Sequence, residues 1–310
     1  MATIDWPRAR RRHRTGPPTW LAAPALAFFG MFALVPLAGV VVLSFMSWNQ
    51  IGTPTWIGLE NWDSLFVDNW ASTSNAIRLS LIVMIASWAV QTPLSLILGV
   101  YIAGKRRYRS VLAVLFFLPL LFSYAAIGIG WKQMLDPNFG LARGLEDEPF
   151  TALSRLLTQN WLGSEQLALP TTMFIIAWVF VPFHSLLYQA GVRQIPANLY
   201  EAAMVDGANL WQRFWSITIP QLRYTIVTSS TLMLVGSLTF FDLIWVMTYG
   251  GPGEATTILP LDMYRTGFLS QQMGKASAIA TILVVVGLTL AIVLNRLSGS
   301  TRMESQQEGM

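Results

Sequence analysis

The segment Glu201-Ala202-Ala203-Met204-Val205-Asp206-Gly207, followed nine residues later by Ile217-Thr218-Ile219-Pro220, decides the fold of this chain. The segment is polar and lies between two apolar runs, at about 169–190 and 224–249. Each run is close to the ~20 apolar residues that a helix needs to cross a membrane. The sequence therefore predicts an ordered connector that joins two membrane-spanning helices.

The connector itself predicts two short helices. Asn198 is a good N-cap and Glu201 completes an arrangement like a capping box, so the first helix is expected to start near Leu199. Gly207 permits a turn that a residue with a Cβ resists, and Pro220 is expected to end the second helix. Spacings of three and four residues give that helix an apolar stripe of Leu210, Trp211, Phe214, Trp215 and Thr218.

Composition supports a membrane protein. The 310 residues are 54% hydrophobic and only 12% charged, whereas soluble domains carry about 25% charged residues. The chain has no Cys and only two His, His13 and His184, which excludes disulfides and thiolate metal sites and disfavours a His-built centre. The basic residues lie in short clusters beside apolar runs, a pattern typical of membrane topology, and no nucleic-acid partner is expected.

The apolar runs predict an all-α, polytopic membrane protein with a cytoplasmic helix–turn–helix loop. Residues 1–19 would form a basic tail, 20–296 the transmembrane domain with its loop at 196–220, and 297–310 a second tail. The first run is too long for a signal-peptide core and is interpreted as a retained span. Six transmembrane helices are expected, at about 20–45, 77–103, 110–131, 169–190, 224–249 and 274–295.

Charge predicts the orientation, because cytoplasmic loops carry an excess of Lys and Arg. The basic residues of one side are Arg8, Arg10, Arg11, Arg12, Arg14, Lys105, Arg106, Arg107, Arg109, Arg193, Arg213, Arg223, Arg296 and Arg302. The acids of the other side include Glu60, Asp63, Asp68, Asp136, Glu146, Asp147, Glu148 and Glu165. Both termini and the 196–220 loop are therefore expected to be cytoplasmic, in a multi-pass protein of the cytoplasmic membrane.

The 196–220 loop resembles the coupling loop of ABC importer permeases. Its pattern is Glu-Ala-Ala, three residues, Gly, nine residues, Ile, any residue, Leu, Pro; Ile219 stands where that pattern has Leu. The resemblance implies that the loop docks on a cytoplasmic ATPase. The alternative is an amphipathic connector lying in the lipid headgroups. The coupling residues would be Glu201, Ala202, Ala203, Gly207, Trp211, Phe214, Trp215, Ile217 and Pro220.

Further motifs narrow the resemblance. The segment 56–62, Phe116-Phe117-Leu118-Pro119, Phe241-Asp242 and Gly250-Gly251-Pro252 are similar to permeases of maltose- and glycerol-phosphate-type importers, specifically to the first of their two permeases. This implies a second, different permease, two copies of an ATPase subunit and an extracytoplasmic sugar-binding protein. ATP and magnesium would be bound by the ATPase, and this chain would hold no cofactor.

The resemblance also implies positions for the substrate pathway. The positions that match sugar contacts of maltose-type permeases are Phe180, Phe183, Met233, Ser237 and Phe240. Aromatic rings suit the apolar face of a sugar, and plain packing in the membrane is the alternative. His184 is an ionisable group inside a span, which makes it a candidate for function, although a structural, hydrogen-bonded His is an equal alternative.

No enzymatic motif is present. The sequence lacks the Gly-x-x-x-x-Gly-Lys-Ser/Thr loop that cradles ATP phosphates, and no catalytic or metal site is predicted. The expected function is therefore the permease subunit of an ATP-driven importer for a sugar or oligosaccharide. The alternatives are an ion-coupled secondary transporter, and an ABC permease for another solute such as a glycerol-phosphoryl compound.

Overall fold

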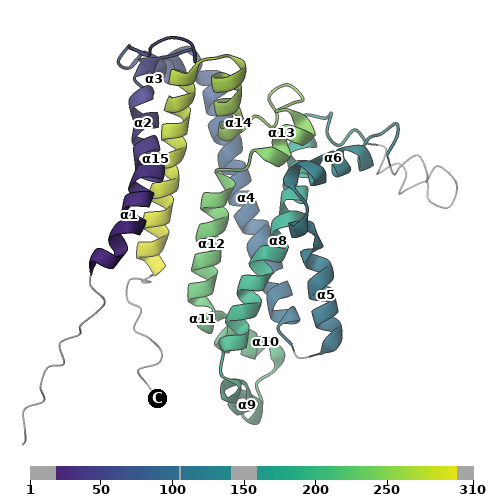
Figure 1. Ribbon diagram of the computed structural model, residues 1–310. Helices are drawn as coiled ribbons and strands as arrows, with labels where there is room; N and C mark the ends of the chain where they lie inside the picture. The colour runs from purple at the N-terminus through teal and green to yellow at the C-terminus, as the bar shows by residue number, and fades with distance from the viewer. Residues whose placement is uncertain (1–18, 105, 141–158, 299–310) are drawn as a thin grey trace, which may run out of the picture.

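The computed structural model describes residues 19–104, 106–140 and 159–298. In this part of the chain nearly all regular structure is helical, and the long helices run along one common direction (Figure 1). The two short strands, β1 (Met46–Ser47) and β2 (Thr55–Trp56), pair antiparallel. The remaining residues of the two tails, together with Lys105 and residues 146–148, lie outside the described residues, and their expected places stay predictions.

Four described helices are long and apolar enough to cross a membrane, or up to six if each bent helix pair is one span. The first span covers Trp20–Leu43 as one run of short helices. These are η1 (Thr19–Ala22), α1 (Ala23–Phe29), η2 (Gly30–Leu34) and α2 (Val35–Leu43). The run agrees with the predicted span at 20–45, and α15 (Met273–Ser298) packs beside it (Figure 1).

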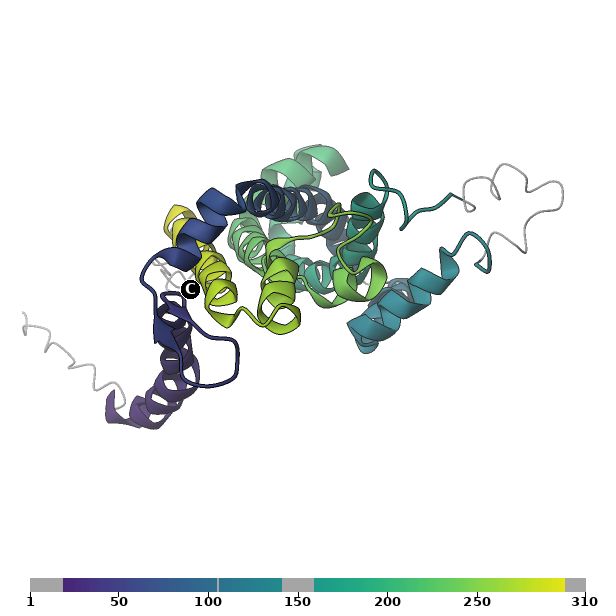
Figure 2. The same ribbon diagram turned by 90° about the horizontal axis from the view of Figure 1, so that it is seen from above.

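The centre of the bundle is formed by α4 (Trp70–Ile102) and α8 (Ala168–Gln194), which pack along much of their length. Their contact is close because Gly99 lies against α8: a Cβ there would be 2.6 Å from the Cβ of Tyr188. Small residues that let two backbones approach are typical of helix pairs in membranes. Figure 2 shows the first span on one side of this centre and α6 on the other.

The third predicted span is not one helix. The chain instead forms α5 (Arg107–Phe117), η4 (Leu118–Leu121) and α6 (Tyr124–Met134), with a bend of 98° before α6. The predicted span at 110–131 therefore corresponds to a bent helix pair. Pro119 cannot donate a backbone hydrogen bond, and the Ser123 side chain accepts from the Ala126 N–H at 3.2 Å and starts a new helix.

The fifth predicted span, at 224–249, also corresponds to a bent helix pair. The chain forms α12 (Arg223–Ser237) and α13 (Asp242–Thr248), with an angle of 45° between them. At the break, the Ser237 hydroxyl donates to the Leu234 carbonyl at 2.7 Å and the Thr239 hydroxyl donates to the Gly236 carbonyl at 2.7 Å. These side chains compete for carbonyls that would otherwise continue the helix.

The main core lies where α4, α8 and α13 meet, close to this break. After α13 the chain forms α14 (Leu259–Tyr264) and η7 (Arg265–Leu269) and then enters α15. The segment before α4 folds as α3 (Glu60–Asp63) and η3 (Ser64–Asp68). The core places the α12–α13 break beside α8, in the interior of the bundle. Its buried members include Leu79, Val83, Ile175, Ile176, Val179, Ile244 and Leu261.

Candidate functional site

The connector between α8 and α12 forms the end of the bundle that α9 occupies in Figure 1. It consists of α9 (Ala197–Val205), α10 (Leu210–Arg213), η6 (Phe214–Thr218) and α11 (Ile219–Gln221). The predicted helix–turn–helix is therefore present. α1 begins and α15 ends toward this same end of the bundle (Figure 1).

The first loop helix begins two residues before the predicted start. It runs from Ala197 after Pro196, whose extended conformation serves as the N-cap. Asn198 lies inside the helix and makes no capping bond, so the predicted capping box with Glu201 is wrong. The capping box forms on the second helix instead. The Gln212 N–H donates to Asn209 Oδ1 at 2.9 Å, and the Asn209 N–H donates to Gln212 Oε1 at 2.8 Å.

Gly207 makes the turn, as predicted. Its φ is +78°, a conformation that glycine adopts without strain. The Gly207 N–H donates to the Met204 carbonyl at 3.1 Å and the Ala208 N–H donates to the Ala203 carbonyl at 2.8 Å. This pair of hydrogen bonds is the Schellman motif. It satisfies the last carbonyls of α9 and fixes the direction in which the chain leaves the helix.

The second loop helix does not end at Pro220. The chain makes a wide turn over η6, in which the Ile219 N–H donates to the Phe214 carbonyl, and helical structure then continues through Gln221. Wide turns of this kind accommodate a residue that breaks the regular hydrogen-bond ladder, and Pro220 has no N–H to donate. The predicted stop is therefore displaced to Leu222, where α11 gives way to α12.

The loop leaves large apolar side chains exposed. Val205, Leu210 and Trp211 are 88%, 79% and 68% exposed, and Trp215 is also exposed. The Trp211 and Trp215 rings are 5.5 Å apart and hold each other in place. Apolar surface of this kind, gathered on one small element, is typical of a site that another protein or a lipid surface covers.

Some of the remaining predicted loop residues lie on this exposed surface, and the others are partly or fully buried beneath it. Glu201 and Ala202 are exposed, whereas Ala203, Phe214 and Ile217 are half-buried. Thr218, predicted on the apolar stripe, is buried, and its Oγ1 is 2.9 Å from Tyr200 Oη. This hydrogen bond ties α9 to η6. The sequence analysis did not single out Tyr200, because nothing in the sequence connects it to Thr218.

The predicted pathway residues do not all gather in one place. Phe180 of α8 and Phe240, at the α12–α13 break, pack with their ring centroids 5.1 Å apart and line a cavity of about 250 Å³. Tyr124 of α6 completes the aromatic wall, 5.6 Å from Phe180. The sequence offered no signal for Tyr124, because α6 reaches this wall only through the 98° bend.

The other pathway candidates do not line this small cavity. His184 is buried, with its Nδ1 3.0 Å from Ser229 Oγ of α12. Met233 is buried and its sulfur accepts from the Thr92 hydroxyl at 3.3 Å. Ser237 is also buried, and its hydroxyl donates to the Leu234 carbonyl of its own helix. Phe183 is 40% exposed and stacks edge-on against His184 at 5.1 Å, away from the cavity that Phe180 lines.

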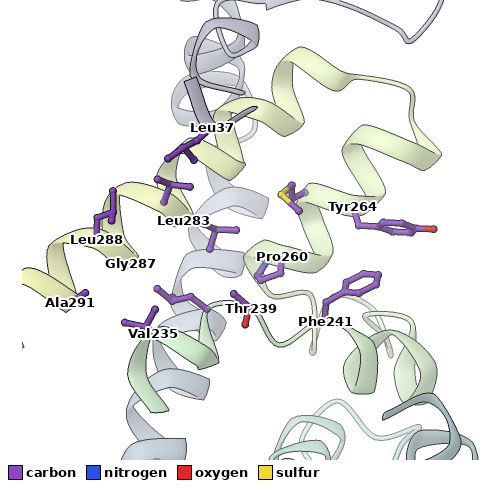
Figure 3. A pocket seen from close by; sticks show the side chains of 13 residues that line it. Leu37, Val235, Thr239, Phe241, Pro260, Tyr264, Leu283, Gly287, Leu288 and Ala291 are labelled. Atoms are coloured by element: carbon purple, nitrogen blue, oxygen red, sulfur yellow. The ribbon is translucent and has the colours of Figure 1, made fainter. Parts of the chain in front are cut away.

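A larger cavity of about 610 Å³ adjoins the break on the side of α2, α14 and α15. Figure 3 shows aliphatic side chains such as Leu37, Leu283 and Leu288 along one part of it, and Phe241 with Tyr264 at the other. Thr239 and Phe241 line both this cavity and the smaller one. The α12–α13 break therefore separates an aromatic compartment from an aliphatic one.

Charged side chains are sparse around these cavities. Asp242 lines the smaller one, and no Lys or Arg is among the residues that line either of them. Asp262 of α14 is partly buried, and its burial raises the pKa of that carboxyl while Lys275 and Arg265 oppose the shift. Within the described ranges, no group of three His, Asp or Glu side chains lies close enough to hold a metal ion.

Comparison with known proteins agrees with this geometry. The family of the binding-protein-dependent transport system inner membrane component matches residues 91–302. The probable ABC transporter permease protein YurN of Bacillus subtilis is 32% identical over 89% of this chain and 94% of its own length. The diacetylchitobiose uptake system permease protein NgcF of Streptomyces coelicolor is 29% identical over 91% of this chain and 83% of its own length.

A solved structure shows the same fold. It is a bacterial ABC transporter involved in the import of the acidic polysaccharide alginate, with a TM-score of 0.77 and 24% identity. The match covers 93% of this chain and 97% of that one.

A bundle of spanning helices with an apolar helix–turn–helix at one end defines the membrane component of an ABC importer. The chain belongs to the family of inner-membrane components of binding-protein-dependent transport systems. The expected all-α, polytopic fold and the resemblance on which it was based are thereby confirmed.

Proposed function

We propose that this chain is one of two different permease subunits of an ATP-driven importer for a neutral sugar or oligosaccharide. It forms half of the translocation pathway, and the residues of α9–α11 transmit closure of a cytoplasmic ATPase to the spans. Both termini then lie in the cytoplasm. The companion permease, two copies of the ATPase and an extracytoplasmic binding protein complete the system.

The observation that carries the coupling role is the exposed apolar surface of the α9–α11 loop. Trp211 and Trp215 are the kind of residue that dominates protein interfaces, where Trp side chains are enriched in the energetically important positions. The turn at Gly207 and the Tyr200–Thr218 hydrogen bond make the loop a rigid unit. A rigid unit can transmit a displacement to α8 and α12, to which it is directly joined.

The nature of the cavity supports a sugar. Phe180, Phe240 and Tyr124 offer ring faces, and the absence of Lys and Arg from the cavity lining favours a neutral solute over a phosphate ester. The relative NgcF is named for diacetylchitobiose uptake, which is the import of a carbohydrate.

In this proposal, ATP hydrolysis by the ATPase subunits supplies the energy for transport. The sequence has no phosphate-binding Gly-rich loop, so ATP and its magnesium ion are held by the ATPase subunits. The chain then acts as a transport subunit with no hydrolytic site of its own.

Trp211→Ala tests the coupling role, with Trp56→Ala as the matched control. Both Trp side chains are about two-thirds exposed, and Trp56 lies in β2, far from the loop. Removal of a central interface Trp should weaken ATPase binding by about 10-fold or more. The measurement is copurification of the ATPase from membranes, together with ATP hydrolysis stimulated by the binding protein.

Two outcomes contradict the proposal. Unchanged copurification and stimulation in Trp211→Ala would assign the loop to the lipid headgroups. Uptake that persists with ATP depleted and stops when the ion gradient collapses would identify a secondary transporter instead.

A further inference from the structure

A row of three aromatic rings runs along α13, and of these only Phe241 lines the cavities described above. Trp245 lies in α13, and Phe241 and Tyr249 directly precede and follow the helix, at intervals of four residues. The Phe241 and Trp245 rings are stacked with centroids 5.8 Å apart, and those of Trp245 and Tyr249 are 3.8 Å apart.

A second row from α14 and η7 extends the first. Tyr264 lies 4.9 Å from Phe241 and 5.0 Å from Trp245, and Phe268 stacks on Tyr264 at 5.2 Å. These five residues form one contiguous group, here called the α13 aromatic ladder. It lies at the end of the bundle opposite the α9–α11 loop (Figure 1).

The ladder is continuous with the small cavity. Phe241 lines that cavity, and its neighbour Phe240 packs on Phe180, which in turn packs on Tyr124. The series of rings from Tyr249 to Phe241 therefore ends at the wall of the small cavity. Figure 3 shows Phe241 and Tyr264 side by side where the series passes the α12–α13 break.

One part of the ladder packs against the core, and the other part is exposed. Phe241 and Trp245 pack against the main core and are only partly buried, while Tyr249 and Phe268 are 61% and 55% exposed. Among the described residues, the Tyr249 and Tyr264 hydroxyls and the Trp245 indole N–H have no hydrogen-bond partner. A ring surface with unused donors is suited to a ligand that has both apolar faces and hydroxyl groups.

Interfacial aromatic residues of membrane proteins provide a simpler explanation for single rings. Such residues form belts around the whole protein at headgroup level. The ladder differs, because its rings stack on one another along a single ridge and continue into a cavity. Lipid anchoring explains neither the stacking nor the continuity.

We propose that the α13 aromatic ladder is a track for the successive sugar rings of a neutral oligosaccharide, which leads one end of the chain into the small cavity. This inference rests on the proposed import of sugars and narrows the substrate to chains of three or more rings. The C–H face of a pyranose is slightly positive and packs on the negative face of an aromatic ring. The free hydroxyls and the indole N–H of the ladder meet the sugar's hydroxyl groups.

The size of the cavity supports a chain that extends beyond it. The cavity measures about 250 Å³, which is below the range of roughly 300–1,000 Å³ that drug-sized ligands occupy. A trisaccharide or longer chain entering it therefore has rings left outside. Those rings lie on the ladder, whose Phe241 borders the cavity directly.

The test compares Tyr249→Ala and Trp245→Ala with Trp245→Phe, which keeps a ring face. Tyr249 is largely exposed, so its removal leaves the core intact if Trp245→Ala proves unstable. Trp178→Ala is the matched control, because Trp178 is an exposed ring on α8 outside the ladder. The complete importer is reconstituted in proteoliposomes with its binding protein. The probes are α-1,4-linked glucose and β-1,4-linked N-acetylglucosamine series, from one to six rings.

The expected result depends on chain length. Trp245→Ala and Tyr249→Ala should each raise the KM for chains of three or more rings by about 5-fold, since one ring contact contributes ~1 kcal/mol. Mono- and disaccharides should change by less than about 2-fold, and Trp245→Phe should restore most of the loss. The Trp178→Ala variant should transport every chain length as the wild type does.

Several outcomes overturn the track. If the KM of the two alanine variants changes equally at every chain length, or does not change, the track is contradicted. Sugar import by the wild type would still stand. Loss of the companion permease from the purified Trp245→Ala complex would show that the ladder is a contact between subunits. If the wild-type importer takes up no member of either series, the sugar assignment of the proposed function fails and the track fails with it.

Discussion

At the scale of single residues, a comparison of two glycines can distinguish the effect of backbone strain from an effect on function. Gly207 and Gly52 both have φ of +78°, and a Cβ at either position would meet no atom within 4 Å. An alanine is therefore strained equally at both sites and clashes at neither. The sites differ only in their place, since Gly207 turns the α9–α10 loop and Gly52 lies between β1 and β2 at the other end of the bundle.

Gly207→Ala should reduce coupling, whereas Gly52→Ala should not. The left-handed conformation is unfavourable for alanine by about 1 kcal/mol, so the Schellman turn should be distorted or populated less. We expect a reduction of about 5-fold in ATPase binding and in stimulated hydrolysis. A titration of the ATPase against both variants in nanodiscs gives the measurement. Equal behaviour of the two variants would show that the α9–α10 angle does not matter for coupling.

Helix caps show how much of the local structure single-residue preferences can predict. The sequence analysis proposed Asn198 as an N-cap, yet Asn209 is the asparagine that caps a helix in the loop. Pro196 explains the difference, because its extended backbone starts α9 before Asn198 is reached. A cap is chosen by the local chain path, which single-residue preferences describe only in part.

At the scale of elements, the α4–α8 contact leaves no room for a side chain at Gly99. A Cβ on Gly99 would lie 2.6 Å from the Tyr188 Cβ and 2.7 Å from the Ser185 carbonyl oxygen. The second contact is with backbone, so no side-chain rearrangement can relieve it. Gly39 of α2 provides the contrast, since a Cβ there meets nothing within 4 Å.

Gly99→Ala should destabilise the protein by about 1–3 kcal/mol, because α4 and α8 must move apart. Gly39→Ala should be neutral or slightly stabilising, since an open helical glycine gains helix propensity when a methyl group is added. Thermal unfolding of the two purified variants in the same detergent measures the difference. A Gly99→Ala variant as stable as Gly39→Ala would contradict the close packing of the two helices.

The broken spans are also decided at this scale. Hydropathy gives no sign of the breaks inside 110–131 and 224–249, because apolar residues continue through both. The structure ends the helices where Pro119, Ser123, Ser237 and Thr239 redirect backbone hydrogen bonds. Irregular backbone at membrane depth is tolerated where protein surrounds it or where it lines a cavity, and the second break lies beside the two cavities.

At the scale of the whole molecule, the orientation is open to a direct test. The 196–220 loop lies at one end of the bundle and the η7–α15 turn at the other (Figure 1). The protein has no Cys, so each introduced thiol reports on its own position without background. Ser216 in η6 and Ser270 after η7 are both exposed.

Ser270→Cys should react with a membrane-impermeant maleimide in intact spheroplasts, and Ser216→Cys only after the membrane is opened. The charge distribution predicts this result, because Lys and Arg cluster on the side of the loop. Labelling of the two variants in parallel, with lysed cells as the positive control, gives the measurement. The reverse pattern would place the loop outside the cell and would rule out its contact with an ATPase.

The sequence by itself determined the class of protein, the approximate spans and the position of the loop between α8 and α12. These properties follow from local features: apolar runs of membrane length, a charge asymmetry, and a motif with fixed spacing. Only the tertiary structure decided which candidate pathway residues share a cavity, and that Tyr124 joins Phe180 and Phe240 there. Ring contacts between helices depend on bends, and the bends depend on where side chains take hydrogen bonds from the backbone.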